Sequence, residues 1–424
     1  MWGKPVRGVL MTLVVVLLSA CKLVVTVPAG GSVESRRGFQ CVGGASCTID
    51  IKHADFADEY FARPNPGYEF AGWRSGPRRV CAGSESACAL SAGPFAALPG
   101  FDDILASNAE FILEPVFNEL KPDRFSRQAW AALIAETTSN QFNSDDFLYR
   151  LVPGVANCDP GVLSRAAQQR FTDALNLVRR LHDLPPVQHD DFFSAESQQA
   201  ALIQMANRYL THEPRTTDTC YSHAADMGAG SSNLFAGSVQ RDPVSFLISW
   251  INDGANVYDK ASAGHRRWAL YPWLAYTTYG QVRGYSAMKV FGFGQSLQSA
   301  PPAGLEFVAF PYREYPYVLL KRQTPTPWSL SMVPASRWSD FDYFAYASVQ
   351  VSETDSGARL NVHSLYRDTR SVGLRNFLSW RVDGWQYDTD YTVRVSNVRL
   401  PGGGLTRVEY PVRIEYDSLV SPSR

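Results

Sequence analysis

The stretch Ala263-Gly-His-Arg-Arg-Trp-Ala-Leu-Tyr-Pro272 divides a helical region upstream from a strand-rich region downstream. It places His265 between a glycine and two arginines. A second histidine, His212, and an aspartate, Asp253, lie upstream. The chain has only 7 histidines in 424 residues, so two of them beside polar neighbours are candidates for a shared site. Each imidazole either converges with Asp253 in a cleft or satisfies a buried hydrogen bond of its own.

The spacing of apolar residues predicts the elements around this stretch. Phe171, Leu175, Val178 and His182 follow a helical period, and Ser194 is expected to cap a second helix. Asp242-Pro243 predicts the start of a third helix, which runs to Asp253. His265 is expected to open a strand-like region, with further strands at 276–279 and 290–293. Helices followed by strands indicate an α+β fold.

Composition limits the class of protein. A hydrophobic share of 45% with a charged share of 19% is typical of a packed globular chain, and the length indicates several domains. The 40 basic residues nearly balance the 41 acidic ones, so the chain lacks the electrostatic footprint of a nucleic-acid-binding protein. We therefore expect no nucleic-acid partner.

The N-terminus has the pattern of an export signal. Lys4 and Arg7 precede the apolar run Val9–Ala20, which is too short to span a membrane as a helix. The run ends in Leu18-Ser-Ala-Cys21, which resembles the lipobox of bacterial lipoproteins. That resemblance implies a signal peptide at 1–20, acyl (palmitate-type) chains on Cys21 and a membrane anchor. Because Lys22 follows rather than aspartate, it implies the outer membrane; the alternative is an ordinary secretory signal.

Six further cysteines fit an exported chain, in which an even number favours disulfides over metal ligands. Cys41 and Cys47 form one close pair, Cys81 and Cys88 a second, and the remaining two flank a helical stretch. These last two are Cys158 and Cys220. The sequence leaves the actual connectivity open.

Residues 22–118 have strand patterns, including 23–27, the alternating Gly67-Tyr-Glu-Phe-Ala-Gly-Trp73 and Ala109–Leu113. With the cysteines, this module resembles the divergent internalin B-repeat-like modules of bacterial surface proteins. The resemblance implies spacing or adhesion and no chemistry. We interpret 119–157 as a connector with a short helix at 126–135.

Seven motifs follow one another between residues 158 and 325: Leu175–Pro186, Leu210–Pro214, Cys220-Tyr221, Ser232–Leu234, Trp250–Asp253, Gly264–Trp268 and Val308–Pro311. In this order they resemble the bacterial branch of the CAP superfamily of cysteine-rich secretory, antigen five and pathogenesis-related proteins. The resemblance implies a central α-β-α sandwich for this region.

In that family a cleft usually holds two histidines and two acidic residues that can take a divalent metal. Carried over, the resemblance implies metal ligation, by zinc or calcium, at His212, Asp253 and His265. The second acid falls near Ser232 and is absent. Neighbouring residues expected in the cleft are Ser232, Asn233, Arg266 and Trp268.

From 326 to 424 the chain alternates again, most clearly at Tyr391–Val395 and at Val408, Tyr410, Val412, Ile414 and Tyr416. Tyr391, in Asp388-Thr-Asp-Tyr391, is similar to the tyrosine corner of immunoglobulin-like sandwiches. The expected module is an immunoglobulin-like β-sandwich with a supporting or binding role.

The sequence therefore predicts a cell-envelope lipoprotein whose CAP-like cleft binds a lipid, a peptide or a cell-wall fragment without catalysis. The observation behind this hypothesis is a cleft signature without a nucleophile or a complete acid–base set. One alternative is a metal-assisted hydrolase, a protease, that uses His212, Asp253 and His265. A third hypothesis treats the domain as an inert adhesion scaffold.

Overall fold

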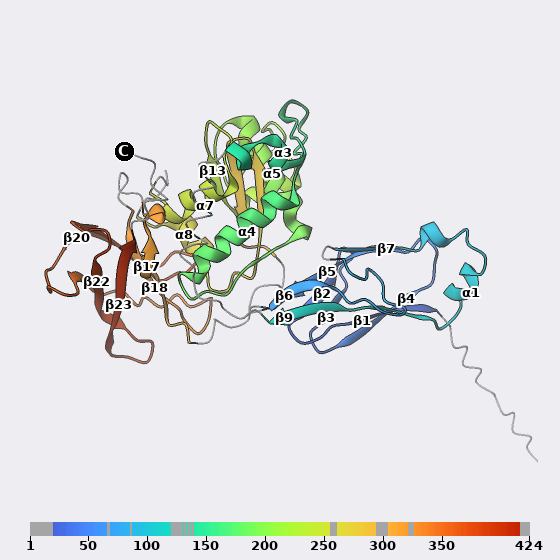
Figure 1. Ribbon diagram of the computed structural model, residues 1–424, viewed down its shortest axis with the longest axis horizontal. Coiled ribbons are helices and arrows are strands. Elements are labelled where there is room, and N and C mark those ends of the chain that lie inside the picture. The colour runs from blue at the N-terminus through green and yellow to red at the C-terminus, as the bar shows by residue number, and fades with distance from the viewer. Residues whose placement is uncertain are drawn as a thin grey trace, which may run out of the picture. The chain divides into compact units, whose positions relative to one another are not determined.

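The computed structural model describes residues 20–65, 68–84, 87–119, 140–254, 261–293, 304–320 and 326–415, together with residues 130, 133 and 137. The chain divides into two compact units. The first comprises 1–64 and 70–118, and the second comprises 65–69 and 119–424. The predicted signal peptide, apart from Ala20, and most of the predicted helix at 126–135 lie outside the described residues. Figure 1 shows the elements of both units.

The first unit is built from short strands with a helical excursion. Its strands are β1 (Cys21–Thr26), β2 (Gly31–Ser35), β3 (Gln40–Val42), β4 (Ser46–Ile51), β5 (Ala57–Pro64), β6 (Tyr68–Trp73), β7 (Cys88–Ser91), β8 (Glu110–Leu113) and β9 (Pro115–Glu119). The excursion contains the 3-10 turn η1 (Gly93–Phe95) and helix α1 (Phe101–Leu105). The sheet orders are β4-β1-β8, β3-β2-β5-β7 and β6-β9. The strands predicted at 23–27, 67–73 and 109–113 are thereby confirmed.

The core of this unit gathers the inward side chains of these strands. Leu23 and Val25 of β1 alternate with half-exposed residues, as a strand with one buried face requires. Trp73 is buried and meets Phe70 edge to face at 5.3 Å between ring centroids, so the interpretation of these aromatics as core residues is confirmed.

The second unit begins with helices around a sheet. Its elements up to residue 289 are η2 (Asn140–Asn143), α3 (Asp145–Leu148), β10 (Tyr149–Leu151), η3 (Val155–Asn157), β11 (Val162–Leu163), α4 (Arg165–Arg180), β12 (Gln188–His189), η4 (Asp191–Phe193), α5 (Ser194–Asn207), α6 (His223–Gly230), β13 (Ser232–Ala236), α7 (Pro243–Asn252), α8 (Gly264–Ala269), β14 (Tyr276–Val282) and β15 (Tyr285–Lys289). Helix α7 begins where it was predicted, because the Asp242 carboxylate accepts a hydrogen bond from the Val244 backbone N–H at 2.9 Å.

Helices α5 and α4 cover opposite faces of the sheet β12-β14-β15-β13. Ser197 of α5 hydrogen bonds with Thr278 of β14, while Phe171 of α4 stacks on Tyr279 at 4.3 Å between ring centroids. Successive residues of a strand point to opposite faces, so the two contacts lie on different sides of the sheet. The fold is therefore mixed α+β, with this sheet buried between helices.

Two further sheets form the C-terminal part of the second unit. Their elements are β16 (Phe307–Phe310), β17 (Arg313–Pro316), η5 (Tyr317–Leu319), β18 (Trp328–Met332), β19 (Ser348–Glu353), β20 (Asn361–Asp368), β21 (Phe377–Asp383), β22 (Asp390–Arg399) and β23 (Leu405–Glu415). The orders are β16-β18-β21-β20 and β17-β23-β22-β19. The alternation predicted in β22 and β23 is confirmed, and Tyr416 lies outside the described residues. The Tyr391 hydroxyl accepts a hydrogen bond from the Gln386 N–H at 2.7 Å, which is the type of bond that a tyrosine corner makes.

The C-terminal sheets begin earlier than the boundary predicted between residues 325 and 326. Strand β16 pairs with β18, and β17 pairs in parallel with β23. Segment 308–311, quoted above as a motif of the central domain, thus forms most of an outer strand of the C-terminal part. At the other end, Leu148 and Tyr149 of the predicted connector are buried in the core of the second unit.

Three disulfides join Cys41 to Cys47, Cys81 to Cys88 and Cys158 to Cys220. Disulfides persist in oxidising compartments, so they indicate an exported protein. Within the described residues, no helix has the length and apolar character needed to cross a membrane.

Candidate functional site

The segment around His265 is a helix and not the strand that its sequence suggested. Ala263 adopts a left-handed backbone conformation with φ of 45°, and α8 starts at the next residue. The Asp253 carboxylate accepts the His265 backbone N–H at 3.0 Å and so caps the exposed N-terminus of α8. Asp253 lies at the C-terminal end of α7, also in a left-handed conformation, with φ of 52°. A cap supplied from the end of another helix gives no local sequence signal, which is why the prediction was wrong.

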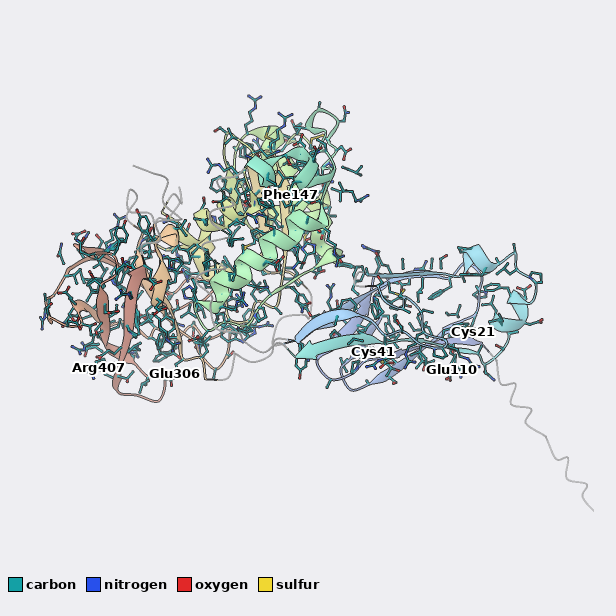
Figure 2. The ribbon with its side chains drawn as sticks, viewed as in Figure 1. Cys21, Cys41, Glu110, Phe147, Glu306 and Arg407 are labelled. Atoms are coloured by element: carbon teal, nitrogen blue, oxygen red, sulfur yellow. A yellow bond between two sulfur atoms is a disulfide. The ribbon has the colours of Figure 1, made fainter. Side chains whose placement is uncertain are left out.

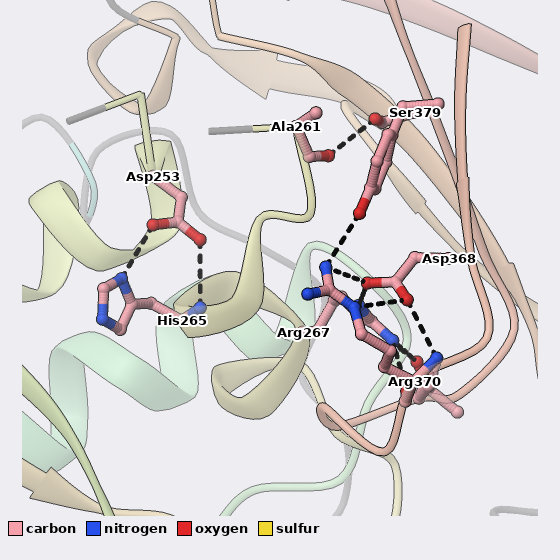
Figure 3. Close-up of polar contacts among 9 residues, drawn as sticks. Asp253, Ala261, His265, Arg267, Asp368, Arg370 and Ser379 are labelled. Carbon is pink, nitrogen blue, oxygen red and sulfur yellow. Dashed lines mark hydrogen bonds and ion pairs between the residues drawn. The ribbon is translucent and has the colours of Figure 1, made fainter. Parts of the chain in front are cut away.

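The same aspartate orients the imidazole. Asp253 Oδ1 lies 2.7 Å from His265 Nδ1, while Oδ2 takes the backbone N–H (Figure 3). Asp253 is 1% exposed, whereas the side chain of His265 keeps 23% of its surface accessible. Since a carboxylate only accepts, the proton of the neutral imidazole is on Nδ1. Nε2 is then left with its lone pair.

His212 is held in the same manner by a different acceptor. It follows α5, and its Nδ1 lies 2.8 Å from the carbonyl oxygen of Ala229 in α6. A carbonyl oxygen only accepts, so Nδ1 again carries the proton. Both histidines therefore have Nδ1 fixed by a protein acceptor, the arrangement that orients an imidazole to bind through Nε2.

One short segment, 229–233, contacts the ring of His212 and the backbone of His265. Ala229 contacts His212, and Asn233 donates from Nδ2 to the carbonyl oxygen of His265 at 2.9 Å. Four peptide units separate these anchors, so their Cα atoms lie no more than about 14 Å apart. Asn233 and Asp253 thus both contact His265, whereas His212 contacts the last turn of α6, just before β13.

The predicted three-ligand metal set does not fit this geometry. Both oxygens of Asp253 are engaged with His265, so the carboxylate acts as the partner of a histidine. Among the described residues, no group of three or more histidine, cysteine, aspartate or glutamate side chains could hold a metal ion. Ser232, near which the absent second acid was expected, is buried, and its hydroxyl has no hydrogen-bond partner in the described part of the chain.

Two of the other residues expected in the cleft are buried in packing. The buried Asn233 donates a hydrogen bond from its side-chain amide to the backbone of α8. Arg266 is 1% exposed, donates from Nη1 to the Pro327 carbonyl oxygen at 2.9 Å and lies over the Phe310 ring at 3.8 Å. Burial lowers the pKa of Arg266 to about 10. Trp268 is half-buried and packs between Tyr271 and Phe291.

Arg267 belongs to a second polar cluster on the other side of α8, which we call the junction. Its guanidinium meets Asp368 at 2.8 Å and donates to the carbonyl oxygens of Arg370 and Leu374 (Figure 3). Gly373 has φ of +58°, and a Cβ there would lie 2.6 Å from the Arg267 backbone, so only glycine lets this loop close over α8. No local pattern indicates this cluster, because Arg267 and its partners lie about a hundred residues apart.

Lys289 forms another buried contact that the sequence reasoning missed. Its ammonium donates to Glu196 of α5 and to the hydroxyl of Ser231, each at 2.7 Å. A lysine beside a serine can activate a nucleophile when the amine is neutral. Here the Lys289 Nζ also lies 2.7 Å from a carboxylate oxygen of Glu196, and Ser231 is buried. The contact therefore fastens α5 to β15 and supplies no nucleophile.

Cys21, expected to carry lipid, is the first residue of β1; it is buried and takes no part in a disulfide. The other six cysteines are paired: the two close pairs are bonded within themselves, and Cys158 is bonded to Cys220 across a separation of 62 residues. The chain matches no family model, and no curated protein matches its sequence.

Proposed function

We propose that the protein is an exported lipoprotein of the cell envelope whose CAP-like domain binds a ligand at His212 and His265. The order of the sequence motifs and the sheet covered by α4 and α5 support a CAP-like α-β-α sandwich. The Tyr391 bond supports an immunoglobulin-like C-terminal module, and the small disulfide-bonded first unit supports an internalin-repeat-like spacer. On this proposal Cys21 carries the acyl chains and anchors the protein to the outer membrane.

The observation that carries the binding function is the matched state of the two imidazoles. Each has Nδ1 held by a buried or backbone acceptor, and each leaves Nε2 unused in the hydrogen bonds of the described residues. Two oriented imidazoles bind a group that donates hydrogen bonds when they are neutral, and an acidic group when they are protonated. Peptides, cell-wall fragments and lipid head groups all offer such groups.

Catalysis has less support than binding. A metal-assisted protease needs at least three protein ligands around its metal, and Asp253 is committed to His265. Ser231 and Ser232, in the segment 229–233 that contacts both histidines, are buried. We therefore assign no step to a metal and treat the hydrolase only as an outcome of the binding test.

The test is a binding series with the chain 21–424 carrying Cys21→Ser, beside His212→Ala/His265→Ala. The probes are purified peptidoglycan fragments, short peptides with a free carboxylate, phospholipid vesicles and Zn²⁺ alone. We expect one organic probe to bind and the double variant to lose at least about tenfold in affinity, the value of roughly one hydrogen bond to each ring.

The matched control is His223→Ala, which removes an exposed histidine from the start of α6. It should bind as the parent does. If every probe that binds the parent also binds the double variant with the same affinity, the proposal is contradicted. Zinc binding with peptide cleavage, both lost in the double variant, would replace it with the hydrolase.

Lipid attachment is tested separately by growing cells with labelled palmitate. Label should appear on the protein and disappear in Cys21→Ser, with the protein released from the membrane fraction. A secreted, unlabelled parent protein would contradict the anchor and leave the imidazole site untouched.

A further inference from the structure

The excursion between β7 and β8 in the first unit exposes apolar residues without a partner. Residues 93–100 read Gly-Pro-Phe-Ala-Ala-Leu-Pro-Gly, and every one of them is exposed. Phe95 is 52% exposed, Leu98 57% and Ile104, in α1, 44%. Neither η1 nor α1 contains a buried residue, and none of this segment belongs to the core of the unit. We call residues 92–106 the apolar tip.

The apolar tip is ordered by its own backbone and not by packing. A succession of turns runs through it, in which the N–H groups of Phe95, Leu98 and Phe101 donate to the carbonyl oxygens of Ala92, Phe95 and Leu98. Exposing apolar side chains to water is unfavourable in free energy. A contiguous apolar patch on a protein surface therefore often marks an interaction site. The tip is therefore shaped to meet something apolar.

Strand register places the apolar tip at the end of the unit where β1 starts. Strand β8 runs parallel to β1 with Lys22 opposite Glu110, and the Lys22 N–H donates to the Ala109 carbonyl oxygen at 2.8 Å. Residues 106–109, which leave α1, therefore lie beside Cys21. Figure 2 labels Cys21 and Glu110 at this end, and Figure 1 shows α1 there.

The other margin of the apolar tip reaches the same end. Cys21 pairs with Ile51 at the last position of β4, and the Ala92 N–H donates to the carbonyl oxygen of Phe56, in the loop that follows β4. Both ends of the excursion are thus tied to the end of the unit at which β1 begins.

We propose that the apolar tip inserts into the surface of a phospholipid bilayer and seats the first unit on the membrane. The proposal extends the lipid anchor proposed above. Cys21 is already the first residue of β1, so acyl chains attached there have no flexible tether. The strand end would lie at the bilayer surface, and Phe95, Leu98 and Ile104 would reach the acyl region beside the anchor.

Charge favours a zwitterionic surface as the occupant. The only charged side chains in the apolar tip are Asp102 and Asp103, which an anionic surface would repel. Lys52, just beyond Ile51, is paired with Asp50 at 3.9 Å and brings little net positive charge. The tip therefore has the character of an apolar wedge and not of a basic patch that seeks anionic lipid.

The experiment uses the acyl-free chain 21–424 with Cys21→Ser and sedimentation with vesicles of phosphatidylcholine and phosphatidylethanolamine. Removing the acyl chains isolates the contribution of the apolar tip. We expect measurable partitioning that falls about tenfold or more in Phe95→Ser/Leu98→Ser/Ile104→Ser, since three exposed apolar side chains no longer enter the bilayer.

The matched control is Val239→Ser/Leu365→Ser/Leu405→Ser, which removes three apolar side chains of the second unit that are 56%, 47% and 56% exposed. It should partition as the parent does. The proposal is overturned if the parent does not bind vesicles, if the tip variant binds as well as the parent, or if the control loses as much as the tip variant.

The palmitate experiment separates this proposal from the anchor on which it builds. Labelled Cys21 with no partitioning of the acyl-free chain would remove the apolar tip and keep the anchor. Partitioning of the acyl-free chain with no label on Cys21 would keep the membrane surface and remove the anchor.

Discussion

Helix α8 separates two polar clusters that are built from the same kind of residue but differ in access. On one side, the buried carboxylate of Asp253 holds His265, whose side chain remains 23% exposed. On the other, the buried carboxylate of Asp368 meets Arg267, and both side chains are 2% exposed. A buried ion pair can only stabilise the fold. An aspartate that orients a partly exposed imidazole also holds that ring in position for a ligand.

The electrostatics of the junction follow from its sealing. Burial acts to raise the pKa of Asp368, but hydrogen bonds from Arg370 and Arg267 outweigh it and hold the pKa below its usual range. Burial lowers the pKa of Arg267. Removing one partner of such a pair leaves the other charge and several carbonyl oxygens without compensation.

The largest expected effect is the loss of the sealed arginine. Arg267→Ala should lower the free energy of unfolding by about 3–5 kcal/mol, because Asp368 and two carbonyl oxygens lose their buried donor. Arg370→Ala removes a 57% exposed partner of the same aspartate and should cost no more than about 1 kcal/mol. Urea denaturation measures both. Equal losses would mean that sealing does not distinguish the two arginines.

Acid should weaken the fold at a different buried group, His182. Its ring lies between the Ala309 carbonyl oxygen and the Tyr315 hydroxyl, and burial lowers its pKa to about 3. In the unfolded chain the pKa is about 6.5, so the unfolded state binds the proton first and acid favours unfolding. The contribution of His182 is complete above about pH 6.5 and is lost as pH falls toward 3, at about 1.4 kcal/mol per pH unit.

The measurement is stability against pH for the parent and for His182→Gln, which cannot take up this proton. The variant should start less stable at neutral pH and show a shallower decline between pH 6 and pH 4. Parallel declines in the two proteins would show that His182 has the same pKa in the folded and the unfolded chain, which would contradict the prediction.

Asp253 has both a structural role and a role at the site, because it caps α8 and orients His265. Asp253→Ala should lower the free energy of unfolding by about 1–3 kcal/mol, because the His265 backbone N–H and the His265 ring both lose their hydrogen-bond acceptor. It should also weaken ligand binding in the series described above. Loss of stability with unchanged binding would show that the orientation of His265 does not matter to the ligand.

The smallest effect on stability is expected at the other imidazole. His212→Ala removes one hydrogen bond to the Ala229 carbonyl oxygen and should cost no more than about 1 kcal/mol, yet it should lower binding as strongly as His265→Ala. Thermal unfolding and the binding series on the same samples check this. A variant that binds normally would exclude His212 from the site.

The sequence predicted best what is encoded locally. The alternation in β22 and β23 and the start of α7 at Asp242-Pro243 depend on residues next to one another. The close cysteine pairs were also predicted correctly. The three helices expected between 165 and 253 were found, although α5 starts at Ser194 itself and not after it.

The rest depends on partners far along the chain. Helix α8 needs a cap from Asp253, and β16 and β17 take their place only by pairing with β18 and β23. Arg266 was expected in the cleft and the burial of Arg267 was missed, because their partners Pro327 and Asp368 lie 61 and 101 residues away. No local pattern distinguishes an exposed arginine from one that is sealed by a distant strand.

The state of the histidine rings tests the central claim most directly, and nitrogen NMR of the chain with ¹⁵N-labelled histidine reads it. With 7 histidines, the signals can be assigned by single substitutions. We predict that His212 and His265 both carry their proton on Nδ1 when neutral, with Nε2 unprotonated and perturbed on addition of the bound ligand. A proton on Nε2 of either ring, or ligand addition that leaves both rings unchanged, would contradict the claim that these two imidazoles are held ready for binding.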